Sequence, residues 1–257
     1  MTFEERVKKV DELLRRDYPI VQTPLLHNNV YELIISVMMS AQTLDATVNK
    51  KTPALFKKYP TVHDLAKANI EDVTRLIAGV NYFHTKAKNM IALANKVVNE
   101  FNGEIPSTME DLTSLPGIGR KTANVVIGEW FSRTPEFRHR AIERQHEGVT
   151  DGRVDGHVKP GDLEMKSFID GFEPSGFVVD THVMRVSQRL GLTNSTTPEK
   201  VEKDLMRIFP KSEWTDVALR MIFHGRYRCT ARNPKCYLDP EWGKICGCAG
   251  EIKSKKG

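Results

Sequence analysis

The stretch Leu115-Pro116-Gly117-Ile118-Gly119-Arg120-Lys121-Thr122-Ala123 decides our interpretation of the fold. Glycines on both sides of Ile118 let the backbone turn tightly and expose its N–H groups. A helix expected from Thr122 to about Phe131 would point its positive dipole end at the same turn. The pattern predicts a helix-hairpin-helix anchored in the core by Ile118, with an anion site suited to a DNA phosphate. A plain Pro-Gly turn between two helices is the alternative; the Leu-Pro entry and the Arg-Lys exit favour the hairpin.

Outward from this stretch, apolar residues recur at helical spacing. One helix is expected between His84 and Phe101 and a more buried one from Val30 to Ala41. Further helices are expected to begin at Pro198 and near Trp214. Helix starts are also indicated by three pairs of a capping residue and an acid, which are Thr61 with Asp64, Asn69 with Asp72, and Thr108 with Asp111. Since these regions lack a convincing alternating strand run, we predict a mainly α fold.

The segment 132–176 breaks this pattern. It has weak periodicity, six glycines and three prolines, and carries seven Lys or Arg against nine Asp or Glu. We interpret it as an inserted, solvated excursion, either a short hairpin around 149–158 or an irregular loop.

The bulk composition excludes several classes of protein. The 257 residues are 40% hydrophobic and 28% charged, which is typical of a globular chain and not of a disordered one. The longest apolar stretch, Leu33–Met39, is too short to span a bilayer, and the charged N-terminus does not resemble a signal peptide. We therefore expect a cytoplasmic protein with no membrane partner. The net charge of +5 favours polyanionic partners only weakly.

Four cysteines lie close together near the C-terminus: Cys229, Cys236, Cys246 and Cys248. In a reducing compartment, such a cluster indicates a metal site before it indicates disulfides.

The hairpin segment LPGIGRKTANVV resembles the endonuclease III family of the helix-hairpin-helix DNA glycosylase superfamily. Four further segments resemble the family in the same order: MSAQTLDATVNK at 39–50, VNYFHTKAKNM at 80–90, VDTHVMRV at 179–186 and HGRYRC at 224–229. The resemblance implies two helical lobes with a DNA cleft between them. A helical barrel at 21–131 would carry the hairpin, and residues 1–20 with 177–257 would form the lobe that bears the cysteines.

The resemblance also implies an activity. The chain would act as a monomer on double-stranded damaged DNA, remove oxidised pyrimidines, and cut the strand at the abasic site that results. Cleaving a base from deoxyribose builds positive charge on the sugar, so an enzyme needs a nearby carboxylate and a nucleophile for the anomeric carbon.

Lys121 and Asp180 match the family's catalytic lysine and aspartate. Lys121 follows the hairpin at a helix N-terminus, where the dipole and partial burial would favour a free amine that forms a Schiff base with the sugar. The alternative is that Lys121 only contacts a phosphate. Asp180 precedes a predicted helix, where an aspartate usually acts as an N-cap, and both roles are compatible.

Other residues match positions that contact DNA in the family. Gln42 would enter the space left by an extruded base, and Tyr82 matches the family's wedge; an ordinary surface amide and a core aromatic are the alternatives. His84 matches a position near the pocket, and His182 matches a position with a supporting role. Arg120 and Lys86 would contact phosphates, with ordinary surface solvation as the alternative. Leu115, Gly117 and Gly119 complete the expected DNA-binding hairpin.

The cysteine spacing departs from the family pattern. The family has Cys-x6-Cys-x2-Cys-x5-Cys around a [4Fe–4S] cluster, whereas this chain has Cys229-x6-Cys236-x9-Cys246-x-Cys248. Four thiolates remain, so we expect a [4Fe–4S] cluster, with a tetrahedral zinc ion and the loss of metal as alternatives.

Three rival functions remain open from the sequence. They are a mismatch-specific glycosylase of the same superfamily, a non-catalytic helix-hairpin-helix module that only binds DNA, and a metal-centred redox sensor. The first generally lacks a lysine at the position of Lys121, and the second needs neither Lys121 nor Asp180.

Overall fold

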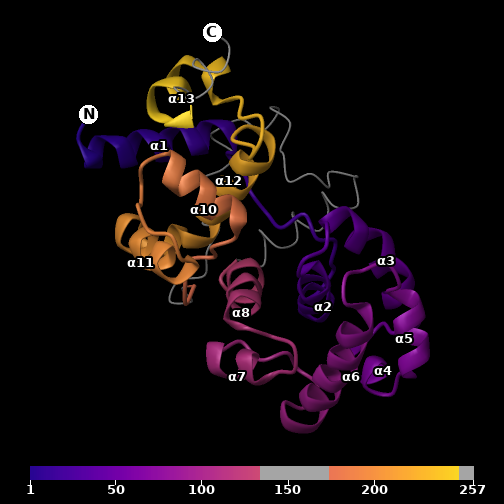
Figure 1. Ribbon diagram of the computed structural model, residues 1–257. Coiled ribbons are helices and arrows are strands. Elements are labelled where there is room, and N and C mark those ends of the chain that lie inside the picture. The colour runs from indigo at the N-terminus through magenta and orange to yellow at the C-terminus, as the bar shows by residue number, and fades with distance from the viewer. Residues whose placement is uncertain (134–173, 249–257) are drawn as a thin grey trace. The chain divides into compact units, whose positions relative to one another are not determined.

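The computed structural model describes residues 1–133 and 174–248 (Figure 1). The predicted excursion at 132–176, including the hairpin suggested around 149–158, falls almost wholly outside these residues. The described residues form helices and contain no β-strand, which confirms the predicted mainly α fold. None of these helices combines the length and the apolar character needed to cross a membrane.

The helix signals read from the sequence are local, and the structure confirms them. Thr61 and Asp64 form a reciprocal capping box at α4 (Val62–Ala66). Asn69 caps α5 (Ile70–Leu76), and Thr108 caps α7 (Met109–Ser114), each through a side-chain oxygen that accepts a backbone N–H. Each cap satisfies donors that the first turn leaves unpaired and stabilises its helix by about 1 kcal/mol.

The chain forms two compact units, each with its own core. Among the described residues, one unit comprises 23–133 with 174–175, and the other comprises 1–22 and 176–248. The first unit contains α2 (Val30–Ser40), α3 (Asp45–Lys58), α4, α5, α6 (Phe83–Glu100), α7 and α8 (Arg120–Val126). Its core includes Leu33, Ile34, Leu55, Met90 and Leu93, all fully buried.

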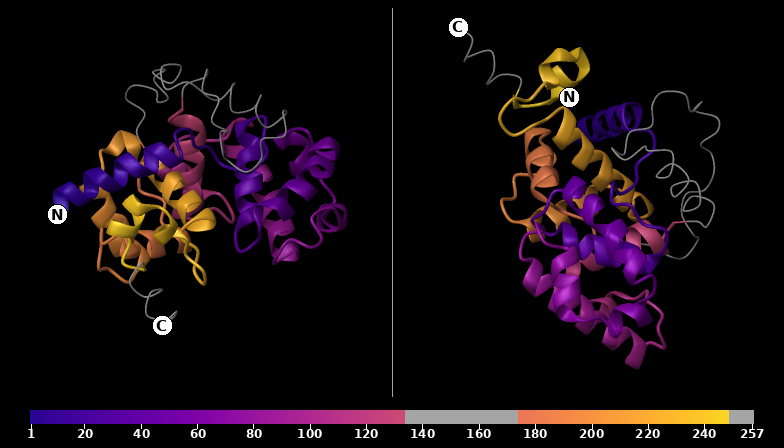
Figure 2. Two further views of the ribbon diagram at one scale, coloured as in Figure 1. Left: turned by 90° about the horizontal axis from the view of Figure 1, so that it is seen from above. Right: turned by 90° about the vertical axis from the view of Figure 1, so that its right-hand side faces the viewer.

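The second unit joins the N-terminal helix to the C-terminal third of the chain. It contains α1 (Phe3–Asp17), α10 (Thr181–Arg189), α11 (Pro198–Ile208), α12 (Trp214–Tyr227) and α13 (Pro240–Ile245). Within this unit, α1 packs against α12 and α13 (Figures 1 and 2). Leu14 of α1, Val186 of α10 and Phe223 of α12 share its core with less than 1% of their surface exposed.

The helix after the hairpin differs from its predicted bounds. It begins at Arg120 and not at Thr122, because Gly119 is extended and serves as the N-cap. Its last turn, η1 (Ile127–Phe131), is a π-helix, in which the Ser132 N–H bonds the Ile127 carbonyl at 2.8 Å. Such a turn adds one residue to the usual hydrogen-bonded ring.

Candidate functional site

The hairpin between α7 and α8 has the geometry that its sequence predicts. Gly117 has a φ of +78°, and the Ile118 N–H donates to the Leu115 carbonyl at 3.1 Å. Leu115 and Ile118 are buried, whereas both glycines are exposed. A Cβ on Gly117 would lie 2.9 Å from Nδ2 of Asn89, so this position excludes other residues by both conformation and space.

Lys121 is the second residue of α8, and its side chain is exposed. The expected partial burial was therefore wrong, because no described residue of this unit covers the Lys121 side chain. Arg120 is exposed beside it. The first turn of α8 thus presents an amine and a guanidinium at the positive end of a helix, an arrangement that attracts anions.

Asp180 caps α10, as the sequence suggested. Its Oδ1 accepts the backbone N–H groups of His182 and Val183, each at 2.8 Å. Among the described residues, both of these hydrogen bonds fall on Oδ1, which leaves Oδ2 available for another group. The cap therefore fixes the position of the carboxylate without using all of it.

A close helix contact holds α10 in place. A Cβ on Gly225 of α12 would lie 2.9 Å from Cβ of His182, so only glycine allows α10 to approach this near. Arg185 of α10 donates to the Gly225 carbonyl at 2.9 Å and to the Cys229 carbonyl at 3.1 Å. Burial lowers the pKa of His182, against the attraction of the neighbouring Asp180 carboxylate.

Gln42 and Tyr82 occupy two neighbouring turns of the first unit. Both adopt left-handed backbone conformations, with φ of 57° and 59°. Gln42 is exposed, and Tyr82 exposes 66% of its surface, so neither is a core residue. His84 is also exposed, with its ring 4.1 Å from that of Phe83. Non-glycine residues rarely adopt this conformation, and those that do concentrate at functional sites.

Lys86 is buried and does not take the exposed position that a phosphate contact or surface solvation would require. Only 7% of it is exposed, and its Nζ donates to the carbonyls of Met39 and Ala41, each at 2.7 Å. Burial lowers the pKa of this amine to about 8. The sequence held a signal for this burial, because Lys86 shares the helical face of Met90 and Leu93 in α6.

The four cysteines converge in the second unit. All four are buried, and their sulfur atoms lie within 4.8 Å of one another. Hydrogen bonds from the thiols of Cys236 and Cys246 hold the pKa of Cys229 below its ordinary value. Arg189, at the last position of α10, reaches the Cys229 sulfur at 3.5 Å and the Thr230 carbonyl at 2.8 Å. The helix that begins beside Asp180 thus ends at the cysteine cluster.

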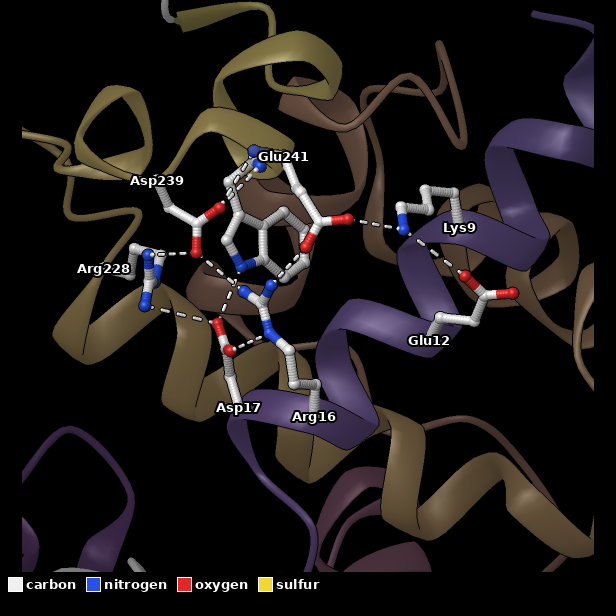
Figure 3. Close-up of polar contacts among 8 residues, drawn as sticks. Lys9, Glu12, Arg16, Asp17, Arg228, Asp239 and Glu241 are labelled. Carbon is white, nitrogen blue, oxygen red and sulfur yellow. Dashed lines mark hydrogen bonds and ion pairs between the residues drawn. The ribbon is translucent and has the colours of Figure 1, made fainter.

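The segment 228–248, which carries the four cysteines and is called the cysteine loop below, is attached to α1 by an ion-pair network (Figure 3). Asp239 caps α13, and its Oδ2 lies 2.7 Å from Arg16 of α1 and 3.3 Å from Arg228. Glu241 completes the network by pairing with Lys9 of α1 at 2.7 Å. Arg228, which adjoins the first cysteine, therefore has a structural role in the loop. Single exposed pairs contribute little, whereas a connected set that shares acceptors contributes more.

Comparisons with known proteins agree with this geometry. Residues 35–211 match the HhH-GPD superfamily of base excision DNA repair proteins. Endonuclease III of Synechocystis sp. is 35% identical, with 91% of this chain and 88% of that protein covered. For endonuclease III of Bacillus subtilis the identity is 34%, and the coverage is 93% and 90%. A solved structure of a trapped covalent intermediate between endonuclease III and DNA is 34% identical, with a TM-score of 0.76 over 98% of this chain and 99% of that one.

The chain belongs to the endonuclease III family. As a member, it is a base excision repair DNA glycosylase with abasic-site lyase activity, and it binds DNA. The fold and the hairpin are those of the family, and a four-cysteine cluster compatible with iron–sulfur binding is present.

The donor set of the cysteine cluster fits a thiolate-bound metal centre. It consists of four sulfur atoms, all shielded from water, and Cys248 supplies the fourth in place of the cysteine missing from the family spacing. A single tetrahedral ion with metal–sulfur bonds of about 2.3 Å would need sulfurs about 3.8 Å apart. A larger cluster would need the thiols to rotate outward. Either centre would require the sulfurs of Cys246 and Cys248, which lie 2.8 Å apart, to separate.

Proposed function

We propose that this enzyme removes oxidised pyrimidines from double-stranded damaged DNA, with Lys121 as the nucleophile of both base excision and strand cleavage. The observation that carries the proposal is the position of Lys121, exposed on the first turn of α8 directly after the hairpin. A phosphate bound by the exposed hairpin and this helix end would hold the adjoining deoxyribose beside the amine.

Lys121 would act first on the anomeric carbon. Its nitrogen lone pair forms a bond to C1′ while the bond from C1′ to the base breaks, and the base leaves with the bonding electrons and gains a proton. Opening of the sugar ring then gives a Schiff base. Loss of a proton from C2′ allows the C3′–O bond to break, so that the phosphate on the 3′ side leaves and the strand is cut.

Asp180 would assist from its capped position. The carboxylate stabilises positive charge on the sugar as the base departs and takes up a proton from the attacking amine. Since Oδ1 is held by two backbone N–H groups, Oδ2 is the atom that would face the sugar.

Base extrusion would depend on the exposed turns. We assign Gln42 and Tyr82 to the space that the extruded nucleotide leaves, and His84, Arg120 and His182 to contacts with the surrounding DNA. The left-handed conformation of Gln42 and the 66% exposure of Tyr82 support this assignment, because both side chains project from tight turns.

Cys229, Cys236, Cys246 and Cys248 would hold a [4Fe–4S] cluster. Such a cluster would join the segment after α12 to the residues that follow α13, and would leave the sugar chemistry to Lys121 and Asp180. The support is the all-sulfur, buried donor set on a chain of this family.

The proposal is tested with duplex DNA that carries one oxidised pyrimidine, compared with the same duplex without the lesion. We expect release of the base and strand cleavage without added alkali, both restricted to the damaged duplex. Base release without cleavage would indicate a glycosylase that uses water. Binding without either product would indicate a module that only grips DNA, and both of these outcomes would overturn the role of Lys121.

A further inference from the structure

Lys86 is a buried ammonium group that the proposed chemistry does not use. Its three N–H donors have three oxygen acceptors: the carbonyls of Met39 and Ala41 at 2.7 Å each, and Oγ1 of Thr43 at 3.4 Å. All three acceptors lie at or just beyond the end of α2, whose last turn contains no basic residue of its own. Burial of a lysine is costly unless its charge is well solvated by such groups.

The contacts of Lys86 surround Gln42. Ala41 and Thr43, the residues on either side of Gln42, both contact the ammonium group. Thr43 also donates from Oγ1 to the Ala41 carbonyl at 3.4 Å. The left-handed turn at Gln42 is thus closed over the Lys86 amine.

The turn of Tyr82 is tied to the turn of Gln42. The backbone N–H of Lys86 donates to the Tyr82 carbonyl at 3.0 Å, and this bond closes the first turn of α6. Between them, Asn81 links the two turns: its backbone N–H donates to Thr43 Oγ1 at 3.1 Å, and its side chain donates to the Gln42 carbonyl. The Lys86 ammonium group therefore reaches the turn of Tyr82 through Thr43 and Asn81, whereas it contacts the turn of Gln42 directly.

A simple helix cap would not need this arrangement. Satisfying the last carbonyls of α2 requires only a cation near its C-terminus, which an exposed lysine on α2 would provide at lower cost. Here the cation comes from α6, is nearly fully buried, and reaches past the helix end to Thr43. Burying Lys86 costs more free energy than an exposed lysine on α2 would, which indicates that its role is to fix the turns at Gln42 and Tyr82.

We propose that Lys86 is a positioning residue, whose ammonium group locks the turns of Gln42 and Tyr82 so that both side chains are pre-organised to fill the space left by an extruded nucleotide. The inference rests on the proposed role of these two residues in DNA. Pre-organisation lowers the cost of binding because the turns need not be ordered on the DNA.

The test uses duplex DNA with a tetrahydrofuran abasic analogue opposite 2-aminopurine, whose fluorescence rises when the base loses its stacking. This readout needs no chemistry. We expect wild-type protein at saturation to raise the fluorescence. With Lys86→Met the rise should be smaller by roughly fivefold or more, because the substitution removes three hydrogen bonds from a charged donor. Lys86→Arg, which keeps the charge and the donors, should restore most of it.

The control is Lys88→Met, two residues later on the exposed side of α6, which should stay within about twofold of wild type. Adding Lys86→Met to a Gln42→Ala, Tyr82→Ala background should cause no further loss, because Lys86 acts through those side chains. If Lys86→Met does not fold, Thr43→Val, which removes only the shared hydroxyl, decides by the same readout.

Three results would overturn the inference. The first is a fluorescence rise with Lys86→Met as large as that with wild type. The second is the same result with Thr43→Val, if Lys86→Met does not fold. The third is a further loss of the rise when Lys86→Met is added to the Gln42→Ala, Tyr82→Ala variant. A wild-type protein that binds this duplex without any rise would instead count against the proposed roles of Gln42 and Tyr82.

Discussion

At the scale of single residues, the structure separates what Asp180 does for the helix from what it would do for the sugar. Oδ1 accepts hydrogen bonds from two backbone N–H groups, and the side-chain oxygen of an asparagine would accept both equally well. Only the carboxylate has the negative charge that a sugar cation requires. The two functions of one side chain can therefore be removed one at a time.

We predict that Asp180→Asn keeps the stability of the fold and loses activity. The melting temperature should stay within about 2 °C of wild type, whereas kcat should fall by roughly 100-fold or more. Asp180→Ala should lose the cap as well, at a cost of about 1 kcal/mol. Thermal melts and single-turnover cleavage measure the two effects separately. Equal activity in wild type and Asp180→Asn would leave Asp180 as a cap only.

Lys86 should give the protein a distinctive pH dependence of stability. Its pKa is about 8 in the folded chain and near 10.5 when unfolded, so the unfolded state binds more protons between these values. The cost of burying its charge is present in full below pH 8 and is relieved as the pH rises to 10.5. The stability of wild type relative to Lys86→Met should therefore increase over this window. Denaturant titrations at several pH values measure it, and a flat difference would contradict the burial of the charge.

The burial of Lys86 also shows where sequence reasoning stops. The hairpin and its buried Ile118 follow from neighbouring residues, and so could be predicted. Lys86 becomes buried only because the end of α2 meets α6 in three dimensions, a contact between residues 39–43 and 86 that no local pattern specifies. Its position on the apolar face of α6 was the available signal.

At the scale of secondary-structure elements, α10 depends on a glycine of its neighbour. We predict that Gly225→Ala destabilises the protein by about 1–3 kcal/mol and lowers kcat, because the added Cβ would meet His182 at 2.9 Å and displace the helix that carries Asp180. Chemical denaturation and single-turnover kinetics measure both effects.

Gly243 of α13 is the matched control for this prediction. A Cβ there would have its nearest neighbour at 3.6 Å, an ordinary contact, so Gly243→Ala should be neutral or slightly stabilising. If Gly225→Ala lowered the free energy of unfolding no more than Gly243→Ala does, the close approach of α10 to α12 would not contribute to stability.

Helix boundaries were predictable to the extent that their signals are local. The caps Thr61, Asn69 and Thr108 each act within one turn of their own helix, and all three were predicted. The π-helical turn at Ile127–Phe131 was not, since it depends on how Ser132 is held where the helix ends. Convergence of the cysteines followed from their number, although their spacing departs from the family.

At the scale of the whole molecule, the metal centre would hold together the C-terminal segment that carries Cys229, Cys236, Cys246 and Cys248. We predict about four iron atoms per chain and a broad visible absorption, both lost in Cys248→Ser. Loss of the centre should also lower the melting temperature, because it releases the loop that Arg189 and the network of Figure 3 attach to α10 and α1. Metal analysis and melts on the purified protein measure this. One zinc ion per chain would contradict the cluster and favour a tetrahedral site.

Lys121 should form the covalent bond to DNA, and trapping with borohydride detects that bond. Wild-type protein mixed with duplex DNA bearing an oxidised pyrimidine should give a stable protein–DNA adduct, because borohydride reduces a Schiff base to an amine. Lys121→Ala should bind the same duplex and give no adduct. An adduct that persists in Lys121→Ala, or wild-type base release that yields no adduct, would exclude Lys121 as the residue that forms the Schiff base.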